Sequence, residues 1–490
     1  MERGKRAQFL VTFSVSLATL TMGVLSAWPT IVIPLFHKNA THIQVTDEVA
    51  SWMVAVSPLG FLSGSLLTRY VSDQFGRRVT VLVSAGPIAL GTLFVILATK
   101  GWMICITKFL WGFGTGMLST VLTMYLVEIS YKDLRGSLNV VTRFMFNFGN
   151  LIVMCIGPFL TYEVLNCSLL ALPLIYLVGC WWIPESPYYH LKEGRVTAAR
   201  KELSRLRNKD AKMLEEELQT MQNSVRNEMR GSSSAKELFT GKQYRRALIV
   251  AAGLKVSQIL TGGMAIQQYL IVIVQESKFS MAPATISIVY GSVKFGVAFI
   301  SSFLVDRVGR RPLLIYSFFG TGISCAIVGS YFFLLDVVQI DHKSLSPYGI
   351  FTFIGIIFST IISNLGFNSI VGIIPAEIFP LNVKAVAMTS LNILGGIMGF
   401  VVGRGYQVIK DLLGLSGVFW IFALVTFGGA TFSYFLVPET RGKSLHEIQI
   451  MIQGVDYNES HVNEIKKSEL EGETELTALR RENDEENKIS

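Results

Sequence analysis

Three basic side chains lie inside long apolar stretches of this sequence, where a charge needs a chemical reason. Arg143 stands in "VTRFMFNFGN", and Lys255 and Lys294 stand in two later stretches of the same kind. A charge at the middle of a bilayer costs about 2.5 to 3.5 kcal/mol even on lenient scales, so such residues rarely face lipid. The nearby stretches offer no obvious buried acid as a partner. The three cations therefore favour a cavity for an anionic or strongly hydrogen-bond-accepting solute; alternatively, they bond backbone carbonyls or snorkel.

Membrane-spanning helices must position these side chains. Hydrophobic residues make up 51% of the chain and charged residues 16%, and apolar runs of about 20 residues recur along it, which is typical of a polytopic membrane protein. The first run lacks a small-residue cleavage site, so we interpret it as a retained span. We predict an all-α fold with twelve spans, near 9–36, 48–70, 79–99, 102–127, 139–161, 168–183, 246–274, 283–304, 312–336, 347–374, 386–410 and 416–437.

The basic residues also indicate the orientation. Arginine and lysine concentrate in alternate loops and in the segment 192–246, and this bias places both termini in the cytoplasm. The sequons at Asn39 and Asn166 then fall on the outer side, where glycosylation is expected. We attribute the net charge of +8 to topology and expect no nucleic-acid partner.

Two polar segments divide the chain. Residues 186–245 are charged and helix-prone, and the segment from 440 onward is rich in both acids and bases. The sequence therefore predicts four parts: a six-helix half at 1–185, a cytoplasmic helical linker at 186–245, a second six-helix half at 246–439 and a cytoplasmic tail at 440–490.

An internal repeat relates the two predicted halves. "DQFGRR" follows the second span and "DRVGRR" the eighth, while "PESP" closes the sixth span and "PETRG" the twelfth. Such pairs at matching spans indicate parallel repeats, as in some transporters. Their acids and bases can form a network of weak ion pairs that latches the cytoplasmic side and reopens in each cycle. The gating candidates are Asp73, Arg77, Arg78, Glu128, Arg135 and Glu185, with Asp306, Arg310, Arg311, Glu377, Lys384 and Glu439.

These motifs, with "YLVEISYKDLRGSL", "AEIFP" and "VPETRGKSL", resemble the signature set of the sugar porter family of the major facilitator superfamily. The first span is most similar to the insect trehalose-transporter branch. The resemblance implies alternating access between the halves, a small-molecule solute such as trehalose or glucose, and a carrier that works as a monomer in the plasma membrane.

The family's sugar ligands are only partly retained. Gln258 keeps the first seventh-span glutamine and Thr261 a hydroxyl, whereas Arg143 and Lys294 replace a ligand glutamine and asparagine. Asn392 can serve if the register of the eleventh span slips. The substrate-binding candidates are Arg143, Asn147, Lys255, Gln258, Thr261, Lys294, Asn364 and Asn392.

Three functions stay open: a facilitative sugar carrier, a carrier of an anionic or other non-sugar solute, and a non-transporting sugar sensor. The first span has no Asp or Glu to serve as a proton site, which favours facilitated diffusion. No clustered metal ligands and no nucleotide-binding loop occur in the sequence, so we expect no metal, no cofactor and no enzyme.

Overall fold

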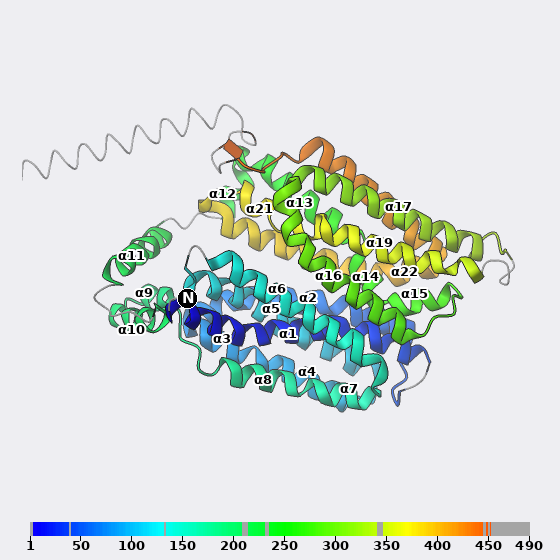
Figure 1. The fold of residues 1–490 in the computed structure, drawn as a ribbon, viewed down its shortest axis with the longest axis horizontal. Helices are drawn as coiled ribbons and strands as arrows, with labels where there is room; N and C mark the ends of the chain where they lie inside the picture. Colours follow the sequence, from blue (N-terminus) through cyan, green and yellow to red (C-terminus); the bar gives the residue numbers. More distant parts are fainter. Residues whose placement is uncertain are drawn as a thin grey trace, which may run out of the picture.

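The computed structural model describes residues 3–38, 41–131, 134–207, 214–230, 235–340 and 346–443, together with residues 447, 448 and 451. Every regular element in this part of the chain is helical, as predicted. The long helices form one bundle, in which the earlier part of the chain (blue to cyan in Figure 1) packs beside the later part (green to orange).

The first half contains six crossings built from eight α-helices and one 3-10 turn. Two of the predicted spans are each divided into two consecutive helices, α3 with α4 and α7 with α8. The elements are α1 Arg3–His37, α2 Asp47–Phe75, α3 Arg77–Val83, α4 Ala85–Ile96, α5 Gly101–Ile129, α6 Arg135–Ile156, η2 Gly157–Phe159, α7 Tyr162–Leu169 and α8 Ala171–Cys180.

The second half follows four linker helices and repeats this plan with more interruptions. The linker contains α9 Pro187–Lys192, α10 Val196–Arg207, α11 Glu215–Arg230 and α12 Ala235–Thr240. The rest of the chain contains η4 Lys242–Tyr244, α13 Arg245–Leu260, α14 Gly263–Gln268, α15 Leu270–Glu276, α16 Pro283–Val308, α17 Arg310–Asp336, η5 Ser346–Gly349, α19 Ile350–Leu365, α20 Phe367–Ile370, α21 Ile374–Ile378 and α22 Leu381–Leu436.

Helix α22 accounts for both of the last two predicted spans. Eleven helical stretches among the described residues are long and apolar enough to cross a membrane, and the last, Val386–Leu436, has 51 residues. At 1.5 Å per residue such a stretch measures about 77 Å, more than twice the hydrocarbon thickness of a bilayer. Gly414 interrupts it with non-helical angles (φ 68°, ψ −177°). The chain turns back at this glycine, which gives the twelve predicted crossings.

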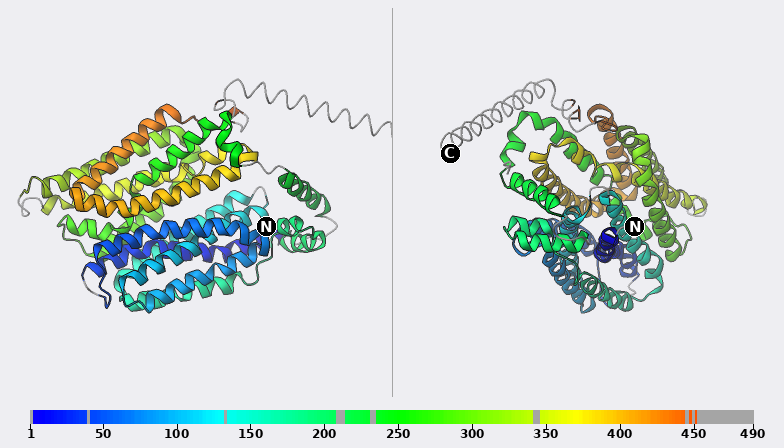
Figure 2. Two further views of the ribbon diagram at one scale, coloured as in Figure 1. Left: turned by 180° about the vertical axis from the view of Figure 1, so that it is seen from behind. Right: turned by 60° about the vertical axis from the view of Figure 1, so that its left-hand side comes forward.

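Linker helices α9 to α12 all lie at one end of the bundle, which we call the linker end; the opposite end is the far end (Figures 1 and 2). Helix α10 is fixed to the first half by Arg207, whose side chain is only 2% exposed. Its Nη1 donates to the carbonyl of Ile129 at 2.8 Å, and its Nη2 lies 2.7 Å from Oε1 of Glu217.

The seventh span breaks at "TGG", and the break turns side chains into the bundle. Gly262 adopts the left-handed conformation (φ 72°, ψ 11°), and a Cβ there would lie 2.1 Å from Cζ of Phe422. Only glycine tolerates both the positive φ and the lack of space for a Cβ at this position. Broken helices inside a bundle free backbone and side-chain polar groups toward a central cavity, and Gln267 and Gln268 of α14 line one here.

The two halves touch closely from the middle of the membrane to the far end. Helices α2 and α22 meet through glycines: a Cβ on Gly403 would lie 2.8 Å from Cα of Ala55, and one on Gly399 would lie 3.0 Å from Cβ of Pro58. Gly291 of α16 approaches the side chain of Met154 on α6 in the same way. Toward the linker end the halves diverge (Figure 1). The bundle is therefore closed at the far end.

Candidate functional site

A cavity of about 560 Å³ lies between the halves. Its wall is formed by side chains of α1, α2, α5 and α6 from the first half and of α13, α14, α16, α19, α20 and α22 from the second. A volume in this range suits a small-molecule ligand. The wall includes six of the predicted substrate-binding residues: Lys255, Gln258, Thr261, Lys294, Asn364 and Asn392.

Six amide side chains contribute to the polar part of this wall. Nε2 of Gln258 donates to Oδ1 of Asn368 at 3.0 Å, and Nδ2 of Asn364 donates to the carbonyl of Thr360 at 2.8 Å. Oε1 of Gln268 has no hydrogen-bond partner among the described residues although the side chain is only 5% exposed. The cavity therefore offers donors and acceptors for several hydroxyl groups of a solute.

Lys108 also lies on the cavity wall, and sequence analysis missed it. It sits on α5, is 3% exposed, and holds its Nζ 5.9 Å from the ring centroid of Trp28 and 5.7 Å from that of Trp111. The signal that would have found it is a lone basic residue in the fourth predicted span.

Lys294 donates to Oε1 of Gln267 at 2.6 Å. Three lysines, rather than two lysines and an arginine, therefore line the cavity.

The structure does not place Arg143 or Asn147 on the wall of this cavity, and their role in substrate binding stays a prediction. Arg143 is exposed and Asn147 half-buried, and neither belongs to the described wall. The amide of Asn147 donates to the carbonyl of Arg143 at 2.8 Å. Phe146, three residues further along α6, does line the cavity. Arg143 shares that helix face but lies about 4.5 Å nearer the linker end, because each residue rises 1.5 Å.

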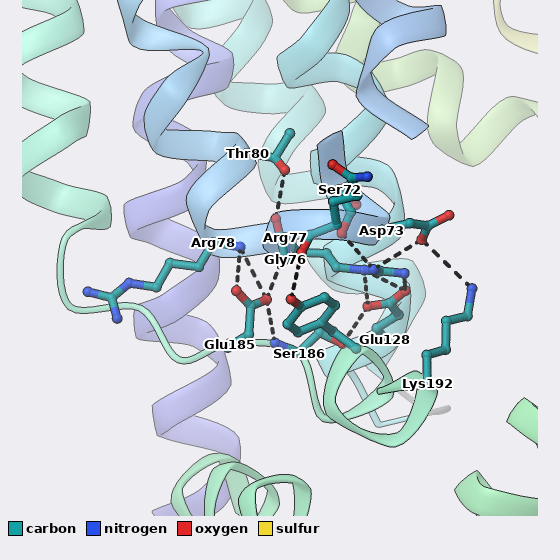
Figure 3. Close-up of polar contacts among 12 residues, drawn as sticks. Ser72, Asp73, Gly76, Arg77, Arg78, Thr80, Glu128, Glu185, Ser186 and Lys192 are labelled. Atoms are coloured by element: carbon teal, nitrogen blue, oxygen red, sulfur yellow. Dashed lines mark hydrogen bonds and ion pairs between the residues drawn. The ribbon is translucent and has the colours of Figure 1, made fainter. Parts of the chain in front are cut away.

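A polar cluster holds the linker end of the first half together (Figure 3). Its centre is Arg77, which is fully buried. The Nε and Nη2 of Arg77 lie 3.0 Å from the carboxylate oxygens of Glu128, and Nη1 donates to the carbonyl of Ser72 at 3.0 Å and to Asp73 at 3.4 Å. The hydroxyl of Ser186 donates to Glu128 from the other side. The cluster joins α2, α3 and α5 to the start of the linker.

Glu185 caps the start of α3 in the same cluster. Its carboxylate accepts the backbone N–H of Arg77 at 2.9 Å and that of Arg78 at 3.1 Å, where the helix dipole favours an anion. Gly76 permits this approach, since its φ is 94° and a Cβ would lie 2.4 Å from Oε2 of Glu185. Burial raises the pKa of Glu185 above its ordinary value, although these amides and that of Ser186 favour the charged form.

The second half repeats the central contacts of this cluster. Nη2 of Arg310 lies 3.3 Å from Oε1 of Glu377, and the hydroxyl of Thr440 donates to Oε2 of Glu377 at 2.5 Å. These three residues take the places of Arg77, Glu128 and Ser186. Because the contacts are repeated as well as the motifs, the two halves share one structural plan, as the internal repeat predicted.

Glu439 is the counterpart of Glu185. Its carboxylate accepts the backbone N–H groups of Arg310 and Arg311, both at 3.0 Å, beside Gly309 with a φ of 106°. Burial acts to raise the pKa of Glu439, but the amides of Arg441, Arg310 and Arg311 outweigh it and hold the pKa below its ordinary value. The pKa values of the two equivalent acids are thus shifted in opposite directions.

No described ion pair of these two clusters joins one half to the other, and the pair of Asp73 with Lys192, 4.0 Å apart, joins the first half to the linker. Lys384, the remaining gating candidate with a described side chain, donates to the carbonyl of Ala376 at 2.6 Å. The side chains of Arg135 and Asp306 lie outside the described residues. In this conformation the predicted latch is therefore two separate clusters, one in each half.

Comparison with known proteins agrees with this architecture. Residues 10–452 match the model of the family described as "Sugar (and other) transporter". The chain belongs to this family. The resemblance found in its motifs is thereby confirmed, as is the all-α major facilitator fold.

Among its relatives in the sugar transporter family is the facilitated trehalose transporter Tret1 of Drosophila willistoni, 31% identical over 94% of this chain and 52% of that protein. The Tret1-2 homolog of Drosophila sechellia is 30% identical over 91% of both chains. The chain thus spans about half the length of several curated relatives. The xylose transporter XylE from E. coli in its inward open conformation superimposes with a TM-score of 0.73 at 19% identity, covering 91% of this chain and 100% of that one.

In this member of the sugar transporter family, the far end carries a polar contact between the halves. Arg404 of α22 lies with its Nη2 3.2 Å from Oε1 of Glu48 on α2, donates to the hydroxyl of Ser51, and stacks 5.0 Å from the ring centroid of Trp52. Sequence analysis did not include Arg404 among the gating residues. The hydroxyl of Thr30 adds a second inter-half bond to the carbonyl of Gln267 at 2.8 Å.

The predicted glycosylation of Asn166 is wrong for the folded protein. Asn166 is fully buried in α7, and its Oδ1 accepts a hydrogen bond from Nε1 of Trp28 at 2.8 Å. An N-linked glycan requires an exposed surface asparagine. Asn39, the other predicted site, lies outside the described residues.

Proposed function

We propose that this protein is a facilitative carrier of a small polyhydroxylated solute, of which a sugar such as trehalose or glucose is the simplest form. The observation that carries the proposal is the central cavity, placed between two repeat-related halves that are closed against each other at the far end. A carrier alternates the side on which such a cavity opens. The names of the trehalose-transporter relatives support a sugar as the solute.

Transport by facilitated diffusion is supported by the composition of the wall. None of the described residues that line the cavity is an Asp or Glu, so the cavity holds no carboxyl group that could bind and release a proton with the solute. We infer that the protein is a carrier rather than an enzyme, and that the solute moves down its own gradient.

Orientation and location follow from charge. We infer that the linker end faces the cytoplasm, because the basic loops lie there, and that the carrier works as a monomer in the plasma membrane. The chain then divides at residues 185, 245 and 439 into two halves, a cytoplasmic linker and a tail. The cavity shown here is in that case open toward the cytoplasm.

Uptake into proteoliposomes tests the proposal. The purified chain is reconstituted without an ion gradient, and entry of radiolabelled glucose and trehalose is followed with and without an imposed pH gradient. We expect saturable uptake that stops when inside and outside concentrations match and does not depend on the pH gradient. Accumulation above that level with an acidic exterior would contradict the uniport mechanism. Sugar binding without any uptake would favour a sensor.

A further inference from the structure

Three basic side chains enter the cavity, and no described acid on its wall pairs with them. Lys108, Lys255 and Lys294 enter it from three helices, α5, α13 and α16. Lys294 is bonded to a neutral amide of Gln267, and no described acid lines the same wall. A buried charge without a counter-charge is unfavourable, so a site of this kind gains most from a ligand that supplies the opposite charge.

The surroundings of Lys108 leave its hydrogen-bond donors available. Trp28 and Trp111 pack edge to face, with centroids 5.1 Å apart, and flank the ammonium group. Their indole N–H groups are bonded elsewhere, to Asn166 at 2.8 Å and to Thr92 at 3.2 Å, which fixes both rings. Aromatic faces attract a cation without occupying its hydrogen-bond donors. The N–H donors of Lys108 therefore stay free for a ligand.

A glycine of α22 leaves space for the side chain of Lys255. A Cβ on Gly395 of α22 would lie 2.9 Å from Cε of Lys255, so the glycine leaves the space in which the lysine chain runs. Among the described residues, Lys255 has no hydrogen-bond or ion-pair partner. Lys108 belongs to the first half, whereas Lys255 and Lys294 belong to the second, so both halves contribute a basic side chain to the wall.

The rest of the wall is suited to hydroxyl groups. Gln258, Asn364, Asn368 and Asn392 line the cavity with amides, and the buried Oε1 of Gln268 lacks a partner among the described residues. A buried polar atom without a partner is destabilising unless a ligand or water satisfies it. The chemistry is therefore that of a ligand with several hydroxyl groups and one anionic group.

We propose that the cavity binds a polyhydroxylated organic anion of the sugar-acid class, whose anionic group lies among Lys108, Lys255 and Lys294 and whose hydroxyl groups bond the amide wall. This inference rests on the proposed function, because the site is the cavity of the same carrier. By bridging lysines of both halves, the anion favours the conformations in which the halves close around it.

The probes are glucuronate and glucose, which share a pyranose ring and differ in one carboxylate. Thermal unfolding of the purified protein is measured with each probe, since a ligand that binds the folded state raises its midpoint. We expect glucuronate to raise the midpoint at concentrations at least tenfold below those that glucose requires. The same two probes are then compared as radiolabelled solutes in proteoliposomes.

Three variants, Lys108→Gln, Lys255→Gln and Lys294→Gln, test the site, and Lys100→Gln is the matched control. Lys100 is exposed at the start of α5 and does not line the cavity. Charge-assisted bonds are stronger than neutral ones, so we expect each cavity variant to lower the ratio of glucuronate to glucose binding about tenfold. Lys100→Gln should keep the wild-type ratio. Size-exclusion profiles of all variants show whether they are folded.

The outcomes separate this inference from the proposed function. Uptake of glucose or trehalose, with no effect of glucuronate on the melting midpoint, would overturn the anion site and leave the carrier. A glucuronate shift that the three lysine variants abolish, without uptake of any solute, would support the anion site and overturn the carrier. If every lysine variant lost binding of glucuronate and of glucose equally, the lysines would be binding a neutral sugar, and this result would overturn the inference.

Discussion

Replacing Gly403 by alanine should prevent the halves from closing fully at the far end. The added Cβ would lie 2.8 Å from Cα of Ala55 and 3.1 Å from its backbone N, and ordinary contact begins at about 3.4 Å. Both obstacles are backbone atoms of α2, which cannot rotate aside as a side chain does. The clash is therefore relieved only by moving α2 and α22 apart.

The size of the effect follows from that overlap. The contact is about 0.6 Å too short, and overpacking of this kind costs about 1 to 3 kcal/mol. The far-end-open conformation does not contain the clash, so the whole cost acts on the equilibrium between the two states. At 1.4 kcal/mol for each factor of ten, we expect Gly403→Ala to shift that equilibrium about 5-fold to 150-fold toward the far-end-open state.

Distances between spin labels measure this shift. Labels at Lys100 and Leu412 report the separation of the halves at the far end, in a background where the exposed Cys167 is replaced by serine. The matched control is Gly405→Ala, because a Cβ at Gly405 meets nothing within 4 Å. We expect longer distances for Gly403→Ala and wild-type distances for the control. Identical distributions in both variants would refute glycine packing as the far-end seal.

Three further predictions concern the polar groups. Glu128→Gln removes the nearer of the two acids that pair with the buried guanidinium of Arg77 and leaves Asp73 at 3.4 Å. The free energy of unfolding, measured in detergent by denaturant titration, should therefore fall by up to about 3 to 5 kcal/mol. Folding lowers the pKa of Glu439 from the value of 4.5 in the unfolded chain, so the charged carboxylate stabilises the folded protein above pH 4.5. This contribution is lost as the pH falls through the lower pKa of the folded state. The difference in the free energy of unfolding between wild type and Glu439→Gln should therefore disappear below pH 4.5. Asn166→Ala removes the acceptor of the Trp28 N–H, and we expect a loss of about 1 to 3 kcal/mol with no change in glycan-dependent gel mobility.

The fold and the two polar clusters were predictable because their signals are local. "DQFGRR" and "DRVGRR" each place a glycine before two arginines at the start of a helix, and the same motif must make the same cap in both halves. Glu128 and Glu377 follow at equivalent spans, and each pairs with the first arginine of the motif in its own half. The spacing of the motifs does not predict whether the two clusters contact each other, because that depends on the relative position of the halves.

The cavity wall was harder to predict, because a charge in an apolar run fixes neither the exact depth of a residue in the bundle nor the direction of its side chain. Arg143 was placed on the wall, yet it lies exposed about one turn from Phe146, which is there. Lys108 follows the start of α5 by only seven residues, a position from which a lysine can also snorkel to the interface. Its burial depends on Trp28 and Trp111, and Trp28 comes from a different helix.

The strength of the contacts within and between the halves explains where the molecule can move. Each half is held together by an ion pair between an arginine and a glutamate, such as Arg77 with Glu128. Each half also has a carboxylate that accepts two backbone N–H groups, such as Glu439 at the start of α17. Breaking a buried group of this kind costs several kcal/mol. Between the halves the described contacts include glycine packing, the hydrogen bond of Thr30 to the carbonyl of Gln267, and the pair of Arg404 with Glu48, whose side chain is 70% exposed. An ion pair this exposed to solvent contributes about 0 to 1 kcal/mol. The least costly conformational change is therefore one that keeps the polar clusters intact and breaks only the contacts between the halves. Such a change is a rocking of two rigid halves around the lysine-lined cavity.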